Sequence, residues 1–142
     1  MTISIVNPEL AGDGGSDGPQ ILLVSPDLLS TSRIAGLARE AGGRLATLRS
    51  LDGPLPAGGP YDLVLLDLQA MHGDPAVLVT KVLALLNPQR ESQTDRQARI
   101  VAFGPHVAKD RLDQAKAAGA DASVSRGELL GGFPAIVKRW CG

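Results

Sequence analysis

The sequence predicts an α/β domain built on a five-stranded parallel sheet with helices on both faces. From Gln20 onward, short apolar runs alternate with stretches in which apolar residues recur at helical spacing. The strongest run, residues 63–66, is apolar throughout, which is typical of a parallel strand buried on both faces. Because parallel strands need right-handed crossover connections, each strand should be followed by a segment that crosses one face of the sheet.

Length and composition favour one domain and exclude several partners. The chain has 142 residues, of which 44% are hydrophobic, and a domain typically has about 100 to 150 residues. Fourteen basic against fifteen acidic residues give a net charge of −1, so we expect no direct binding to nucleic acid or membrane. No apolar stretch approaches the roughly 20 residues of a membrane helix, and a cytoplasmic location is expected.

The N-terminal part differs in composition from the rest. Residues 1–19 are expected to form a flexible leader and residues 20–142 the folded domain, because the segment LAGDGGSDGPQ has almost nothing to bury. Ile3, Ile5 and Val6 alternate weakly, which leaves open an extra strand that pairs with a neighbouring molecule.

The first half of the domain is expected to hold two strands, a helix and an irregular crossover. Residues 21–24 form a continuous apolar run, and a helical pattern follows over residues 29–41 until Gly42. Arg44 to Leu48 can form the next strand. Residues 50–60 are rich in proline and glycine, so this crossover should be irregular or reduced to one turn.

Three strands and three helices are expected in the second half. After the strand at 63–66, Pro75 suits the first turn of a helix that runs to about residue 86. The polar segment 87–97 predicts a long surface loop. A strand at 99–103 and a helix at 107–118 follow.

The C-terminal segment predicts a short strand at 122–124, a capping box and a final helix. Ser125 and Glu128 have the spacing in which a serine and a glutamate each satisfy the other's backbone N–H. Glycines and a proline interrupt the following stretch, so we expect a turn near Glu128 and a last helix at 133–140.

The flavodoxin-like strand order 2-1-3-4-5 fits this pattern and indicates where the chemistry should lie. In such sheets ligands bind beyond the carboxyl ends of the strands. The candidate residues at those ends are Ser25, Pro26, Asp27, Asp67, Gly104 and Arg126.

Four segments together resemble the receiver domains of bacterial response regulators. ILLVSPD, YDLVLLDL, RIVAFGPH and AGADASVSR have the order and approximate spacing of that family's strands one, three, four and five, over about residues 20–140. The resemblance implies a two-component, phosphorelay signalling role with Asp67 as the candidate phospho-acceptor. It also implies a protein partner, either a histidine kinase or a downstream signalling protein.

The sequence departs from the family's pattern at the positions that assist phosphorylation. The acidic pair that holds magnesium in the family falls on Ser25 and Pro26, and only Asp27 could partly substitute. The family's threonine or serine becomes Gly104, and its lysine becomes Arg126. The resemblance therefore implies a divergent, pseudo-receiver-like member with a degenerate metal and switch site, and no cofactor beyond weakly bound Mg²⁺.

Several readings of the site remain open at this point. Asp67 either retains phosphorylation, or accepts hydrogen bonds from loop N–H groups, or serves in binding. Arg126 could pair with Asp67 and mimic a constant signalling state. His72 and His106 could approach the same rim, but solvent-exposed loop histidines are the simpler expectation, and no metal ligand is assigned.

Two functional classes follow from these observations. The first is a stand-alone, non-enzymatic signalling module that acts by protein interaction, with a homodimer conceivable through the face of the C-terminal helix, strand five and the helix after strand four. The second is a small-anion-binding protein or enzyme on the same fold that uses Ser25, Asp67 and Arg126. The sequence contains no G-x-G-x-x-G, P-loop or G-x-S-x-G motif.

Overall fold

The computed structural model describes residues 18–92 and 98–141. Its sheet contains five parallel strands in the order β3-β2-β4-β5-β6. Their bounds are β2 Gln20–Val24, β3 Arg44–Leu48, β4 Leu63–Asp67, β5 Arg99–Gly104 and β6 Ala122–Ser125. The predicted order 2-1-3-4-5 is thus confirmed. Of the leader expected at residues 1–19, residues 1–17 lie outside the described residues, and so does the alternative strand at Ile3 to Val6.

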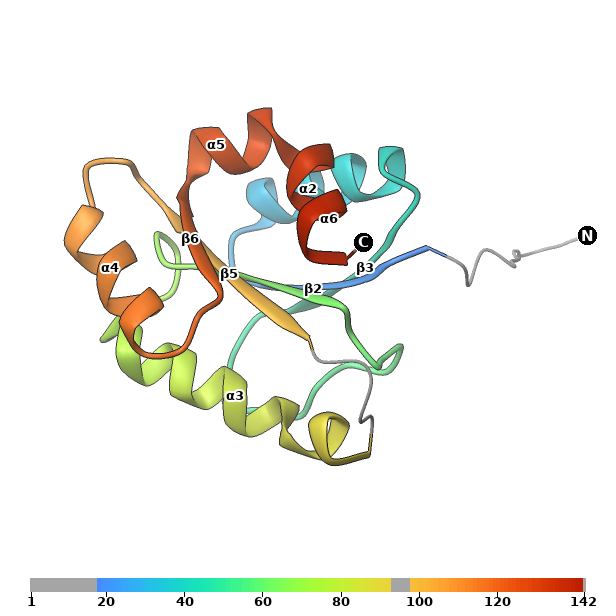
Figure 1. Cartoon of the computed structure of the whole chain (residues 1–142), viewed down its shortest axis with the longest axis horizontal. Coiled ribbons are helices and arrows are strands. Elements are labelled where there is room, and N and C mark those ends of the chain that lie inside the picture. Colours follow the sequence, from blue (N-terminus) through green and yellow to red (C-terminus); the bar gives the residue numbers. More distant parts are fainter. Residues whose placement is uncertain (1–17, 93–97, 142) are drawn as a thin grey trace, which may run out of the picture.

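Helices cover both faces of the sheet, as Figure 1 shows. One face carries α2, α5 and α6, and the other carries α3 and α4. The helices span Leu28–Glu40 (α2), Pro75–Ser92 (α3), Lys109–Ala117 (α4), Arg126–Gly131 (α5) and Phe133–Cys141 (α6). Among the described residues no helix is both long and apolar enough to cross a membrane.

The central strand β4 separates two hydrophobic cores. Alternate β4 side chains point to opposite faces, so Val64 and Leu66 join the core under α3 and α4, whereas Leu63 and Leu65 join the core under α2 and α6. All five residues of β4 are buried. This burial explains why the run is apolar until it reaches Asp67 at the carboxyl end.

The crossover between β3 and β4 contains turns and no helix, as its prolines and glycines predict. Leu51 and Leu55 pack against the core beneath α3. The buried Tyr61 closes the segment by donating its hydroxyl to the carbonyl oxygen of Pro56 at 2.6 Å. A loop with its own apolar contacts therefore occupies the place of a crossover helix.

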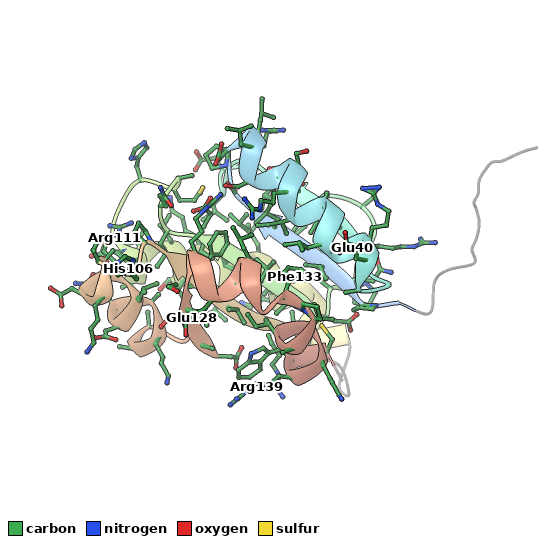
Figure 2. All side chains as sticks on the ribbon, turned by 90° about the horizontal axis from the view of Figure 1, so that it is seen from above. Glu40, His106, Arg111, Glu128, Phe133 and Arg139 are labelled. Carbon is green, nitrogen blue, oxygen red and sulfur yellow. The ribbon has the colours of Figure 1, made fainter. Side chains whose placement is uncertain are left out.

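The predicted termini of the last elements are close to those observed. Ser125 accepts a hydrogen bond from the backbone N–H of Glu128, and the Glu128 carboxylate accepts one from the N–H of Ser125, which confirms the capping box. The final helix begins at Phe133 as expected. Phe133 is fully buried at the start of α6, and Arg139 lies toward the other end of the helix (Figure 2). Trp140 is only partly buried and has the Arg139 guanidinium over its ring.

Two predicted boundaries are wrong. Helix α3 continues to Ser92, whereas a loop was expected from residue 87. Gln89, Arg90 and Glu91 have high intrinsic helix propensity, so polarity alone does not mark a loop. Val107 was expected within a helix but precedes α4 and is 79% exposed. The helix was thus expected to begin two residues before its observed start at Lys109.

Candidate functional site at the carboxyl end of the sheet

The loops that follow β2, β4 and β6 bring polar side chains together at the carboxyl end of the sheet. Ser25 follows β2 directly, Asp67 ends β4 and Arg126 begins α5 directly after β6. The parallel pairing of β2 with β4, which matches Val24 to Leu66, places Ser25 opposite Asp67 in the next register position. The sequence-predicted residues thus meet at one end, in two groups of hydrogen bonds that are joined by the contact between the Asp27 N–H and the Ser25 hydroxyl.

The first network holds the Asp67 carboxylate. Its Oδ2 accepts a hydrogen bond from the Ser25 hydroxyl at 2.8 Å. Its Oδ1 accepts from the backbone N–H groups of Gln69 at 3.0 Å and Ala70 at 3.1 Å. Both carboxylate oxygens therefore accept hydrogen bonds from the loops that follow β2 and β4. This geometry agrees with the interpretation of Asp67 as an acceptor for loop N–H groups.

Asp67 and Ser25 are also removed from solvent. Both side chains are 0% exposed, and with Ser30 they are the only fully buried polar or charged residues among those described. The Ser25 hydroxyl in turn accepts from the backbone N–H of Asp27 at 3.1 Å, so it is fixed from both sides. A buried carboxylate is tolerated only with such hydrogen bonds, because the desolvation of an unpaired charge is costly.

The second network joins the start of α2 to the start of α5. Asp27 caps α2 by accepting the N–H of Leu29 at 3.2 Å, and its other oxygen accepts the Ser30 hydroxyl at 2.6 Å. The Ser30 oxygen accepts from Nη2 of Arg126, also at 2.6 Å. Among the described residues no ion pair links Arg126 to Asp67, so the expected pair is replaced by a bridge through Ser30 to Asp27.

This bridge alters the acidity of Asp27. The hydrogen bond from the Ser30 hydroxyl is the main cause that lowers the pKa of Asp27, and the backbone N–H groups and the Arg126 charge add to it, against an opposing effect of burial. A carboxylate with a lowered pKa stabilises the fold above its ordinary pKa, and this stabilisation is lost as pH falls through the folded-state pKa.

Replacing Ser30 with alanine should therefore raise the pKa of Asp27 toward its ordinary value. The acid limb of the stability profile should also become less steep, because less of the stability depends on ionised Asp27. Carboxyl NMR titration measures the pKa directly. Thr31→Ala is the matched control, since Thr31 donates only to the backbone oxygen of Asp27. An unchanged Asp27 pKa in Ser30→Ala would contradict the assigned cause.

The remaining candidate residues lie at the margins of the site. Pro26 is exposed, and its carbonyl oxygen accepts from Nη1 of Arg49 at 3.3 Å. A Cβ added at Gly104 would contact Leu68 and Leu112 at ordinary distances, so a side chain there would enter the core beneath α4. His72 and His106 are both exposed, and Figure 2 shows His106 near the start of α4.

Three solved structures resemble the described fold. A receiver domain of sensor histidine kinase PA1611 from Pseudomonas aeruginosa PAO1, with magnesium in its active site cleft, has a TM-score of 0.64 and 20% identity, and the match covers 88% of this chain and 98% of that one. A two-component response regulator from Clostridium difficile gives 0.63 and 21%, covering 85% and 93%. The orphan response regulator HP1043 of H. pylori gives 0.61 and 15%, covering 90% and 98%.

The chain has the fold of response-regulator receiver domains. No family model matches the sequence, and no curated protein matches it. The likeness therefore concerns the receiver fold, its strand order and its helices on both faces. In this fold Asp67 ends the central strand.

The similar PA1611 receiver domain holds magnesium in its active site cleft, and the residues present here fit such a site poorly. Mg²⁺ prefers oxygen ligands in near-octahedral geometry and usually keeps one or two carboxylates with several waters. Here the Asp67 carboxylate is buried against Ser25, while Asp27 is committed to the α2 cap and Ser30. Within residues 18–92 and 98–141 no group of three or more His, Cys, Asp or Glu side chains is placed to hold a metal ion.

Sequence reasoning did not find Ser30 or Arg111. Ser30 lies three residues after the helix cap Asp27, a spacing that places both on one turn of a helix, and this signal was available. Arg111 donates to the carbonyl oxygens of Leu68 and Gly73 at 3.1 Å, which fixes the loop after Asp67 against α4. Nothing in the sequence marks this arginine among the others.

Proposed function

We propose that this chain is a receiver-like signalling module of a two-component, phosphorelay type system that acts by protein–protein interaction. Its phosphorylation site is degenerate, and in the described conformation Asp67 is withheld from phosphodonors. The observation that carries this proposal is the fully buried Asp67 carboxylate, closed by the Ser25 hydroxyl and two loop N–H groups. The receiver fold supports a signalling function, and the burial of the Asp67 carboxylate supports its restricted phosphorylation.

The restriction follows from the geometry of phosphoryl transfer. A carboxylate oxygen must reach the phosphorus in line with the leaving group, and cations must offset the charge that accumulates there. Both Asp67 oxygens accept hydrogen bonds instead, and the Arg126 guanidinium is held by Ser30. Phosphorylation would therefore require Ser25 and the loop after β4 to move first, which makes Asp67 a poor phospho-acceptor and Mg²⁺ binding weak.

The surface proposed for a partner lies at the β6 edge of the sheet. β6 is an edge strand whose four residues are all partly exposed, and α4 and α5 both contact it. The C-terminal helix α6 packs over β4 and against α2 and α5, without extensive contact to β6, so we propose the face formed by α4, β6 and α5. A kinase, a downstream signalling protein or a second copy of the chain would bind there.

Incubation with acetyl phosphate and Mg²⁺, followed by intact-mass measurement, tests the proposal. We expect no adduct, or a small fraction that forms slowly, because the acceptor oxygens are buried. Asp67→Asn is the control that assigns any adduct to Asp67. Stoichiometric, magnesium-dependent labelling that disappears in Asp67→Asn would contradict the restricted site and indicate an ordinary receiver.

The alternative, an anion-binding protein or enzyme that uses Ser25, Asp67 and Arg126, receives less support. An anion between these residues would have to displace the Asp67 carboxylate, which repels it, and separate Arg126 from Ser30. No observed contact brings the Arg126 guanidinium toward the Ser25 hydroxyl. The non-enzymatic reading is therefore the one we propose.

A further inference from the structure

A hollow of about 340 Å³ lies next to the Asp67 loop, between the start of the β3–β4 crossover and the first turns of α3. This volume is at the small end of the range of roughly 300 to 1,000 Å³ for ligand sites in proteins. The hollow is lined by Pro26, Arg49, Ser50, Leu51, Asp52, Ala70, Met71, His72, Leu78 and Lys81.

The charged groups of the hollow favour an anion. Arg49 and Lys81 carry positive charge against the single carboxylate of Asp52, so the lining has a formal charge of +1 with His72 neutral. Arg49 makes one long hydrogen bond, at 3.3 Å, to the carbonyl oxygen of Pro26. A guanidinium also presents a planar fork of donors that matches the oxygens of a phosphate.

The lysine is also held only weakly. Its Nζ lies 4.0 Å from Oδ1 of Asp52, and the two side chains are 51% and 87% exposed. Exposed pairs of this kind contribute little to stability, so an incoming anion can displace Asp52 at small cost. The Asp52 carboxylate has a second partner in the Ser50 hydroxyl, at 3.3 Å.

The floor of the hollow is apolar. Leu78 is 6% exposed and belongs to the core beneath α3, and Leu51 and Met71 pack against that same core. Ligand sites typically combine apolar groups of this kind with polar groups that fix orientation, and here the two kinds of residue are equally numerous. A small inorganic ion would leave this floor unused, whereas an ester with an apolar group would cover it.

We infer that this hollow binds a small phosphomonoester that carries an apolar group. The phosphate lies between Arg49 and Lys81, and the apolar group covers Leu51, Met71 and Leu78. A dianionic phosphate matches the two cations of Arg49 and Lys81.

The position of this site connects it to Asp67 without using that residue. Pro26 directly follows Ser25, and the backbone N–H of Ala70 donates to Asp67 at 3.1 Å. A ligand in the hollow thus contacts both loops that enclose the buried carboxylate. The inference goes beyond the proposed signalling function, and it does not depend on whether Asp67 accepts a phosphoryl group.

Titration with phenyl phosphate, followed by ¹⁵N–¹H NMR of the full chain without Mg²⁺, tests the inference. We expect saturable shifts at the amides of residues 49–52 and 70–72, with weaker binding of inorganic phosphate at the same amides. Equal affinity for both probes would overturn the role of the apolar floor. Shifts spread over basic residues of the whole surface, or no saturation, would overturn the site.

Variants that remove either the cations or the carboxylate of the hollow should change phenyl phosphate binding in opposite directions. Arg49→Gln with Lys81→Gln should weaken phenyl phosphate binding about a hundredfold, since each of the two charged hydrogen bonds contributes about tenfold. Asp52→Asn should instead tighten it by about threefold, because a like charge is removed. The matched control is Arg33→Gln with Lys138→Gln, which changes two exposed cations outside the hollow. Equal binding by the two double variants, or weaker binding by Asp52→Asn, would contradict the inference.

Phosphorylation of Asp67 is measured separately, as a covalent mass change with acetyl phosphate and Mg²⁺. Stoichiometric labelling of Asp67 would contradict the proposal that its phosphorylation is restricted, and it would not bear on ligand binding in the hollow. Failure of phenyl phosphate to bind would overturn the inference that the hollow is a ligand site, and it would not bear on the proposed signalling function.

Discussion

Replacing Asp67 with alanine is expected to lower the free energy of unfolding by about 3 kcal/mol or more, since three donors lose their acceptor and a donor left unpaired costs at least about 1 kcal/mol. Three donors lose their acceptor: the Ser25 hydroxyl and the N–H groups of Gln69 and Ala70. The Ser25 hydroxyl is fully buried and cannot turn to water. Urea denaturation measures the loss.

Asp67→Asn is the matched control for this experiment. The amide has nearly the same volume and keeps one carbonyl oxygen for the loop N–H groups, so the expected loss is only about 1 kcal/mol, the net value of one hydrogen bond. A loss below about 1 kcal/mol in Asp67→Ala would mean that the donors find water and that the carboxylate is accessible. It would count against the burial on which the proposed function depends.

Replacing Ser25 with aspartate is expected to destabilise the protein by about 4 kcal/mol in the absence of divalent cations, as two like charges about 4 Å apart repel by that amount at an effective dielectric of 20. The new carboxyl group would stand where the Ser25 hydroxyl now donates to Asp67 at 2.8 Å. Either the two charges repel or one carboxyl group takes up a proton. Thermal or urea unfolding in EDTA measures the cost.

Magnesium should restore part of the stability of Ser25→Asp, because a second carboxylate beside Asp67 supplies the pair of ligands that this ion commonly uses. Ser25→Asn is the control, since it has the shape of aspartate without the charge and should show no response to Mg²⁺. Full stability of Ser25→Asp in EDTA would show that the loops open readily to water. Absence of a magnesium effect in Ser25→Asp would show that the carboxylates cannot converge on an ion.

The sheet was predictable because burial on both faces leaves a direct record in the sequence. Residues 21–24 and 63–66 are apolar because these positions of β2 and β4 are all buried. The irregular crossover was predictable from its prolines and glycines, which constrain the backbone locally. The end of α3 was not predictable, because polar residues with high helix propensity occur in helices as well as in loops.

The site was predictable in position but not in its contacts. Strand order alone brings Ser25, Asp67 and Arg126 to one end of the sheet. Whether a long arginine side chain meets Asp67 or Ser30 depends on where α2 begins, and that is set by the Asp27 cap. The partner of Arg126 depends on differences of a few ångströms between side-chain positions, and the spacing of residues in the sequence does not determine these positions.

The bridge from Arg126 through Ser30 to Asp27 extends to Asp67, because the Asp27 N–H donates to the same Ser25 hydroxyl that closes the Asp67 site. Arg126 begins α5, at the edge where a partner is proposed to bind, so the surface and the buried carboxylate share one line of hydrogen bonds. A partner that favours a different position of Arg126 would also favour a different enclosure of Asp67. Thermodynamic reciprocity requires the reverse as well: opening of the Asp67 site would change the affinity for that partner by the same factor. Partner binding at the surface and opening of the Asp67 site would then be coupled equilibria, each of which shifts the other.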